Sequence, residues 1–221
     1  MSRSRQVPVL VLVLLVGEQV FGASWHTVFR DDFDSGVGAA NSPDPERWIV
    51  NHPASYWWTQ GRTFFPSPQY HPDAPFPHVE NGACVIEHHL YNPYDLAVEP
   101  WTFLGGEIRT AIDFSPQRSY RFEARVRCHE YPGGVVTSFF SYGYDGSESD
   151  EIDFEFLSKK TNDNATYPTG DPVLTNTWNE SLESPEYVPT EGLDLCEWNT
   201  LRIYWHPDLS RIEWTCDFGC K

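Results

Sequence analysis

Apolar and polar side chains alternate strictly along several short segments of the chain. In residues 120–128 the even positions are apolar, whereas the odd positions between them are Arg or Glu. Residues 107–113 and 201–206 show the same period of two, with Ile108, Ile112, Leu201 and Ile203 on their apolar sides. This period is typical of a half-buried strand, so each segment is predicted to place one face on a core.

Weaker candidates for strands lie at residues 26–33, 83–90, 135–142, 172–178 and 211–217. No long window shows a helical period, and 18 Pro and 15 Gly interrupt the 221 residues. Many short strands separated by turns predict an all-β domain of the sandwich or jelly-roll type.

One long segment, residues 53–78, has no period and combines several prolines with many aromatic side chains, including Tyr56, Trp57, Trp58 and Tyr70. A loop of this length in a compact domain is usually functional or disordered, and aromatic residues argue against disorder. Two interpretations stay open: a wall of a cleft on which sugar rings stack, or a small satellite core.

The N-terminus has the pattern of a signal peptide. Arg3 and Arg5 precede the apolar run Val9–Val16, and the small residues Gly22 and Ala23 follow. The run is shorter than the about 20 residues that span a bilayer. We expect cleavage near Ala23, a domain over residues 24–221, and a secreted or periplasmic protein. A buried N-terminal strand or an uncleaved anchor is the alternative.

Charge and cysteine usage narrow the function further. The formal net charge is −17, from 15 Lys and Arg against 32 Asp and Glu, which argues against nucleic acid and anionic membranes as partners. The negative charge also favours a neutral polymer as substrate over a sulfated or uronic-acid polymer.

The cysteines and histidines match no metal-ligand spacing. Five cysteines leave at least one thiol unpaired, and their connectivity stays open: Cys84, Cys128, Cys196, Cys216 and Cys220.

The motif that carries chemistry is Asp150-Glu-Ile-Asp-Phe-Glu-Phe-Leu157. On a strand, Glu151, Asp153 and Glu155 point to one face and the apolar residues between them to the other. Three like charges in a row repel one another, so the arrangement needs a reason. Glycoside hydrolysis supplies one, because it needs one ionised and one protonated carboxyl group side by side. A solvated strand face is the alternative.

This motif and its flanks resemble glycoside hydrolase family sixteen, and within it the bacterial licheninases, which are mixed-linkage β-glucanases. The resemblance runs from about residue 26 to about residue 217. Its other segments follow in the family's order: Phe29-Arg-Asp-Asp-Phe-Asp34, Pro45-Glu-Arg-Trp48, Asn81-Gly82, Gly105-Gly-Glu-Ile-Arg-Thr110, Tyr120-Arg-Phe-Glu-Ala-Arg-Val126, Phe139-Phe-Ser-Tyr142, Asn176 with Trp178, Asn199-Thr-Leu-Arg-Ile-Tyr-Trp205 and Ile212-Glu-Trp214.

The resemblance implies a concanavalin A-like jelly roll of two antiparallel sheets and a retaining endo-glycosidase. It implies Glu151 as the nucleophile, Glu155 as the general acid and base, and Asp153 as a hydrogen-bonding neighbour of Glu151. No extra residue separates Asp153 from Glu155 beyond Phe154, and this resembles licheninases and xyloglucan transferases more than laminarinases or agarases. We expect a hydrolase acting on mixed-linkage glucan, because the neighbouring segments resemble bacterial members.

Further residues match family positions that contact the sugar, and each has a structural alternative. Glu107 and Arg109 share a face, with an exposed ion pair as the alternative. Core packing is the alternative for the aromatic residues. The expected substrate-binding residues are Glu107, Arg109, Phe140, Tyr142, Asn176, Trp178 and Asn51.

The C-terminal residues 214–221 depart from the family pattern, and we expect the last strands of the jelly roll to be missing. A structural calcium ion, which relatives bind through a late acidic residue, is therefore doubtful, and no cofactor is expected. We expect a monomer whose partner is a polysaccharide. The alternatives are a non-catalytic carbohydrate-binding sandwich, a truncated pseudoenzyme, or a family member acting on laminarin or xyloglucan.

Overall fold

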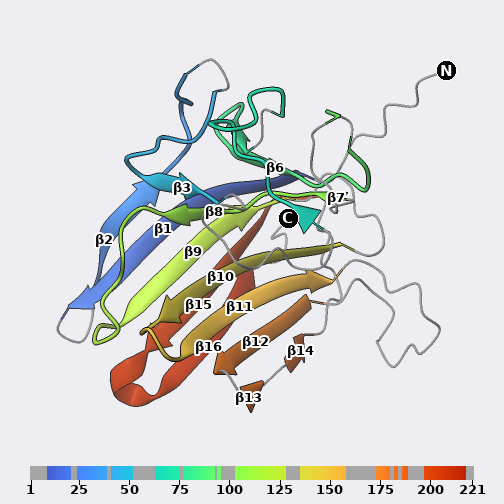
Figure 1. Ribbon diagram of the computed structural model, residues 1–221. Helices are drawn as coiled ribbons and strands as arrows, with labels where there is room; N and C mark the ends of the chain where they lie inside the picture. Colours follow the sequence, from blue (N-terminus) through green and yellow to red (C-terminus); the bar gives the residue numbers. More distant parts are fainter. Residues whose placement is uncertain are drawn as a thin grey trace.

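The computed structural model shows an all-β protein (Figure 1). It describes residues 9–20, 24–38, 41–51, 63–74, 77–92, 94–95, 103–127, 135–157, 173–179, 182–183, 186–188 and 197–217. Within these ranges the chain forms sixteen strands and one short 3₁₀ helix at Pro207–Leu209. None of the described residues belongs to a helix long and apolar enough to cross a membrane.

The larger sheet has seven strands. Its order is β16 (Arg211–Asp217), β15 (Asn199–His206), β9 (Tyr120–Val126), β1 (Val9–Val20), β6 (Cys84–Glu87) and β5 (His78–Val79), and β2 (Ser24–Asp31) also pairs with β1. Every pair in this sheet is antiparallel.

The second sheet has five strands and is also antiparallel. Its order is β10 (Val136–Tyr144), β11 (Ser149–Leu157), β12 (Val173–Asn179) and β13 (Leu182–Glu183), with β14 (Glu186–Val188) also on β12. Two short pairs complete the described fold: β3 (Trp48–Val50) with β8 (Ile108–Thr110), and β4 (Thr63–Phe64) with β7 (Phe103–Leu104). The predicted all-β jelly-roll sandwich is confirmed.

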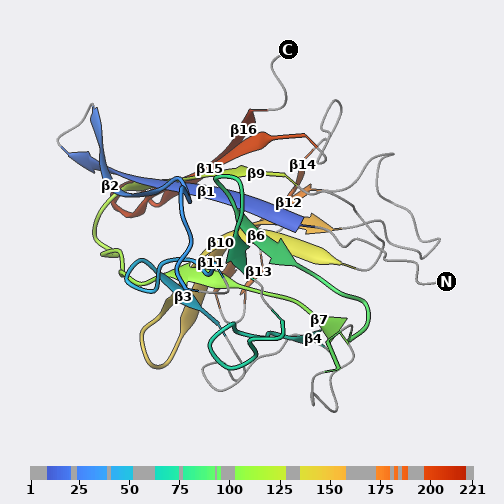
Figure 2. The ribbon, with the colours of Figure 1, turned by 90° about the horizontal axis from the view of Figure 1, so that it is seen from above.

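The two sheets pack as layers, with the main core between them (Figure 2). Phe122 and Ala124 of β9 contribute to it from one layer, and Phe154 and Phe156 of β11 from the other. Burying each phenylalanine contributes about 1.5–3 kcal/mol. A hydrogen bond of 3.0 Å, donated by Trp214 Nε1 to the main-chain oxygen of Asp153, also links the layers. The alternation read from residues 120–126 and 151–156 therefore predicted the core faces correctly.

The strand predicted over residues 107–113 is shorter than expected. β8 ends at Thr110, and the side chain of Ile112 is 42% exposed. Ala111 N–H still donates to the carbonyl of Arg47 in the register of the β3–β8 pair. The chain bends at residues 111 and 112, where the Thr110 hydroxyl donates to the carbonyl of Ile112. The expectation that Ile112 faces the core is therefore wrong.

The N-terminal segment contributes a strand in this structure. β1 lies between β9 and β6, and its last part pairs with β2. This pairing corresponds to the N-terminal-strand alternative, whereas cleavage near Ala23 and the domain boundary there stay predictions.

The described part of the aromatic segment forms a small second core. Phe64, Ala74 and Leu104 are buried together, and Tyr94 packs against them, whereas Tyr70 is exposed. For Phe64 the satellite-core interpretation holds. Tyr56, Trp57, Trp58 and Phe76 lie outside the described residues.

Cys84 and Cys216 are both free thiols. Burial raises the pKa of the Cys84 thiol well above its ordinary value and that of Cys216 to about 12, so both stay protonated. Cys128, Cys196 and Cys220 lie outside the described residues.

Candidate active site

The three carboxylates of the motif lie on β11, which is paired along almost its whole length by β10 on one side and β12 on the other. Ile152, Phe154 and Phe156, which alternate with them, are only 8%, 2% and 1% exposed. The buried apolar residues fix the orientation of the strand, because a slip of one residue would exchange its two faces. Glu151, Asp153 and Glu155 are thereby held on the face directed away from the core.

The strand register places the other candidates beside these carboxylates. On β10, Ser138, Phe140 and Tyr142 lie opposite Glu155, Asp153 and Glu151. On β12, the residues opposite the same three carboxylates are Leu174, Asn176 and Trp178. Directly paired residues project from the same face of a sheet. The structure thus brings Phe140 and Tyr142 of β10 and Asn176 and Trp178 of β12 together with the motif on β11.

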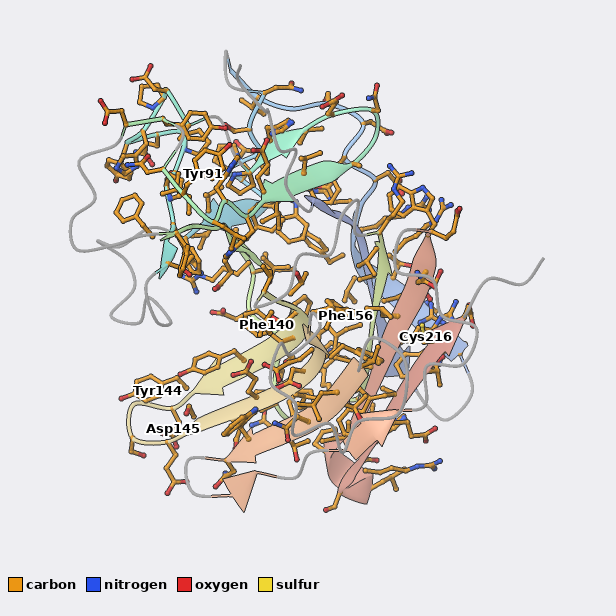
Figure 3. The ribbon with its side chains drawn as sticks, turned by 90° about the vertical axis from the view of Figure 1, so that its right-hand side faces the viewer. Tyr91, Phe140, Tyr144, Asp145, Phe156 and Cys216 are labelled. Carbon is orange, nitrogen blue, oxygen red and sulfur yellow. The ribbon has the colours of Figure 1, made fainter. Side chains whose placement is uncertain are left out.

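Aromatic side chains flank Glu151 on both sides. Tyr142 is 52% and Trp178 is 42% exposed, and Phe140 is half-buried (Figure 3 labels Phe140 on β10). Tyr142 and Trp178 are therefore not core residues, which leaves their rings available to a ligand on this face. Large aromatic side chains around a few polar groups are typical of ligand sites.

The middle of the site is a buried polar pair of residues. Asp153 is 1% exposed and Asn176, opposite it, is completely buried. Neither the oxygen nor the nitrogen of the Asn176 amide has a hydrogen-bond partner among the described residues. Leaving a buried polar group unpaired costs about 1–3 kcal/mol. Asn176 is therefore a buried amide beside the carboxylate row whose polar atoms the described part of the fold leaves unsatisfied. The hydrogen bond expected between Asp153 and Glu151 stays a prediction.

Glu107 and Asn51 add a second polar unit from the β3–β8 pair. Asn51, only 1% exposed, donates its side-chain amide to Glu107 Oε1, and its backbone N–H donates to the carbonyl of Glu107 at 3.1 Å. Burial raises the pKa of Glu107, while the Asn51 hydrogen bond and the charge of Arg109 lower it. Arg109 itself is exposed. The buried partner of Glu107 is thus Asn51, so an exposed ion pair does not describe this unit.

Electrostatics connect Glu107 with the motif. The pKa of Glu151 is raised to about 7, first by burial, then by the charge of Glu155 and then by that of Glu107. Charges raise a neighbouring carboxyl pKa in this way only when they are close, so the three carboxylates form one coupled group. The pKa of Glu151 therefore lies close to neutral pH, the range in which a carboxyl group can exchange protons during catalysis.

The opposite face of β11 holds a small cavity of about 60 Å³ between the sheets. Phe154, Phe156, Trp214 and Cys216 contribute to its apolar lining, and Figure 3 shows Phe156 and Cys216 on that side of the strand. The cavity belongs to the core and not to the carboxylate face. Among the described residues no group of three or more His, Cys, Asp or Glu side chains is arranged to hold a metal ion.

The sequence reasoning did not single out Tyr144. This residue pairs with Ser149 at the end of β10 and projects from the same face as Tyr142. The signal was available in the sequence, because Phe140, Tyr142 and Tyr144 continue one period of two.

Comparison with known proteins gives one family. The sequence model described as "Glycosyl hydrolases family 16" matches residues 83–218, more than half of the chain, and the matched stretch contains the whole carboxylate row. No curated protein matches the chain.

Proposed function

The chain belongs to glycosyl hydrolase family 16, a family of glycosidases acting on β-linked polysaccharides, and from this premise we propose that it is a retaining endo-β-glucanase. The observation that carries the proposal is the row Glu151, Asp153 and Glu155 on a strand whose other face is buried. A row of three carboxylates would be unfavourable on a merely structural strand.

In the proposed mechanism, Glu151 attacks the anomeric carbon while Glu155 donates its proton to the glycosidic oxygen of the leaving sugar. The bond to the leaving oxygen breaks as an ester bond to Glu151 forms. Glu155, now ionised, then takes a proton from water, and the hydroxide formed displaces Glu151 at the anomeric carbon. Two inversions give net retention. Asp153 lies between the two glutamates along the strand and acts as a positioning residue.

The separation of the two glutamates supports this mechanism only if their side chains converge. Positions four residues apart on a strand lie about 13 Å apart along the backbone. Retaining enzymes hold their two carboxyl groups about 5–5.5 Å apart. The charge of Glu155 raises the pKa of Glu151, which supports an approach of the carboxylates closer than the backbone spacing.

The raised pKa of Glu151 determines when it can attack. A nucleophilic carboxylate must be ionised, so we expect kcat/KM to rise as the pH increases through about 7. A raised pKa alone would also suit an acid, so the assignment of the two roles needs a chemical test.

Azide rescue supplies that test. In Glu151→Ala, azide can fill the space of the missing carboxylate and attack directly, which gives an α-glycosyl azide. In Glu155→Ala, azide instead attacks the covalent intermediate and gives a β-glycosyl azide. The opposite pair of products would exchange the two roles, and undiminished hydrolysis by Glu151→Ala would contradict the proposal as a whole.

We propose mixed-linkage β-1,3-1,4-glucan as the substrate. The support is the regular ladder of β11, whose pairing with β10 and β12 runs through Asp153, Phe154 and Glu155 without an inserted residue. Reducing-sugar release should be measured on mixed-linkage glucan, laminarin, xyloglucan and agarose. Faster release from laminarin or xyloglucan would keep the enzyme class and replace the substrate.

The second candidate is a non-catalytic carbohydrate-binding sandwich, which the exposed rings of Tyr142 and Trp178 favour. It predicts that the chain is retarded in a glucan-containing gel but releases no reducing ends. The coupled carboxylates favour the enzyme, because a binding module does not need a nucleophile.

A further inference from the structure

The hairpin of β10 and β11 continues beyond the carboxylate row. Its last pair is Tyr144 with Ser149, and residues 145–148 form the turn. Figure 3 shows Tyr144 and Asp145 at the end of this hairpin, away from Phe140 in the body of the sheet. Tyr144 is 65% exposed, more than Tyr142 in the same row. An aromatic side chain is thus presented to solvent on the face that carries the carboxylates.

The turn that holds Tyr144 is well organised by hydrogen bonds. The Asp145 carboxylate accepts bonds from Ser147 N–H and Ser147 Oγ–H, both at 2.8 Å, and from Glu148 N–H at 2.9 Å. Asp145 N–H donates to the carbonyl of Glu148 at 3.2 Å. Gly146 adopts a φ of 102°, a backbone conformation that residues with a Cβ atom rarely adopt. These bonds define the backbone beside Tyr144, so its Cα is held in a fixed position at the end of the hairpin.

Tyr144 joins two other exposed aromatic residues at the Glu151 end of the row. Tyr142 and Trp178 lie opposite Glu151 on the two neighbouring strands, and Tyr144 is two residues further along β10. Two residues on a strand advance about 6.6–6.8 Å, which is comparable to the length of one sugar ring. Exposed apolar surface gathered in one place commonly marks a binding site. A ring at Tyr144 is therefore too far along to serve the same sugar as Tyr142.

We propose that Tyr144 forms an outlying sugar-binding position, which takes one further pyranose ring of a β-glucan on the Glu151 side of the row. The C–H groups on the face of a β-glucopyranose form an apolar surface that stacks on an aromatic ring. The turn fixes the backbone that carries Tyr144 before the sugar arrives, so little backbone ordering is lost on binding. This inference rests on the proposed function, because it needs a β-glucan on the carboxylate face.

The test compares Tyr144→Ala with Tyr144→Phe and with the control Tyr91→Ala. Tyr91 is also exposed, at 45%, but lies in a different part of the molecule (Figure 3). For each variant, kcat/KM is measured on mixed-linkage oligosaccharides of increasing length. Affinity electrophoresis in gels that contain mixed-linkage β-glucan measures binding separately. Melting temperatures identify any variant that loses stability.

We expect Tyr144→Ala to lose about three- to tenfold in kcat/KM on long oligosaccharides, since one aromatic contact has that value. Short oligosaccharides that do not reach the hairpin end should be cleaved as by wild type. Tyr144→Phe should keep wild-type efficiency, because stacking uses the ring, and Tyr91→Ala should match wild type throughout. Equal efficiency of Tyr144→Ala and wild type at every length would overturn the inference.

Failure of the proposed function gives a different result. If wild type binds glucan in the gel but cleaves none, the enzyme proposal fails, and gel retardation alone decides the role of Tyr144. Weaker retardation of Tyr144→Ala then supports the binding position, and equal retardation overturns it. If wild type neither binds nor cleaves, both proposals are wrong.

Discussion

Two opposing requirements act on the charge of the Glu151 side chain. Its proposed attack needs a charge, whereas burial and the neighbouring Glu155 and Glu107 disfavour that charge and raise its pKa to about 7. A carboxyl whose folded-state pKa lies above its unfolded value binds more protons in the folded state. Stability is therefore highest below the unfolded pKa and is lost as the pH rises toward about 7. The site should thus cost folding free energy at the pH at which it works.

Replacing Glu151 with Gln should reveal this cost. At pH 4 the wild-type carboxyl is mostly protonated, so the two proteins should unfold with similar free energies. At pH 8 the variant should be more stable by about 1–2 kcal/mol, after allowance for solvent screening of a half-buried group. Urea unfolding at both pH values measures the difference. A variant less stable than wild type at pH 8 would show that the ionised carboxylate is stabilised in the fold.

Glu107 should influence the pH profile through Glu151. In Glu107→Gln a negative charge near Glu151 is removed, so the pKa of Glu151 falls and the acidic limb of kcat/KM moves to lower pH. The proposed contact of Glu107 with a sugar hydroxyl would lose its charge as well, which should raise KM about tenfold. The control is Glu80→Gln, an exposed carboxylate beside His78 and outside the site. If the acidic limb of kcat/KM stays at the wild-type pH, Glu107 does not influence the pKa of Glu151 and acts only by contacting the substrate.

At the residue scale, the sequence predicted which face of a strand a side chain occupies better than which residue that side chain contacts. Alternation sufficed to place Ile152, Phe154 and Phe156 in the core, because a strand leaves only two directions for a side chain. It could not predict that Asn51 holds Glu107, since these residues are 56 positions apart and meet only through the β3–β8 pair. The complete burial of Asn176 was likewise invisible, because it depends on layers of the fold that no local pattern encodes.

The strand β11 is the element on which the site depends. Phe154 is 2% exposed and lies between Asp153 and Glu155, so its ring anchors the strand in the core directly beneath the carboxylates. Phe154→Ala should destabilise the fold by about 3–5 kcal/mol, because a large cavity replaces the ring. The matched control is Val136→Ala on β10, where the side chain is 56% exposed and the cost should be small. Thermal unfolding of both variants measures the difference, and comparable losses would contradict the anchoring role.

Most strands of seven or more residues were predicted as elements, but the longest, β1, was interpreted as part of a signal peptide with an N-terminal strand as the alternative. The predicted segment 211–217 coincides with β16, and 135–142 and 172–178 lie within two residues of β10 and β12. β4 and β7 contain two residues each and form a parallel pair, which no periodicity could show. β8 ends at Thr110, where the chain bends and the Thr110 hydroxyl donates to the carbonyl of Ile112. Periodicity needs about four residues to be visible, whereas loop contacts decide where a strand ends.

At the scale of the whole molecule, the arrangement in two antiparallel sheets came from the resemblance, and the order of strands within each sheet was not predicted. β9 pairs with β15 across more than seventy residues of sequence, and a pattern within either strand contains no information about the other. The family match over residues 83–218 confirms the inference at the level of the family. The carboxylate row was recognisable because its alternation and its flanks both pointed to one chemistry. The substrate was not fixed in this way, since specificity depends on side chains spread over several strands.

The net charge of −17 should select against anionic substrates. The candidate site adds Glu107, Glu151, Asp153 and Glu155 on one side of the molecule, so a polymer with its own carboxylates meets repulsion both at long range and in the site. On carboxymethylated mixed-linkage glucan, kcat/KM should be low at about 10 mM salt, where the Debye length is about 30 Å, and should increase at about 0.15 M, where it is about 8 Å. On the neutral polymer, kcat/KM should change little over the same range, because only the charged substrate is repelled. Comparing two polymers of equal backbone length therefore distinguishes the effect of substrate charge from the effect of substrate shape. Equal salt dependence on the two polymers would show that the acidic field does not control access to the site.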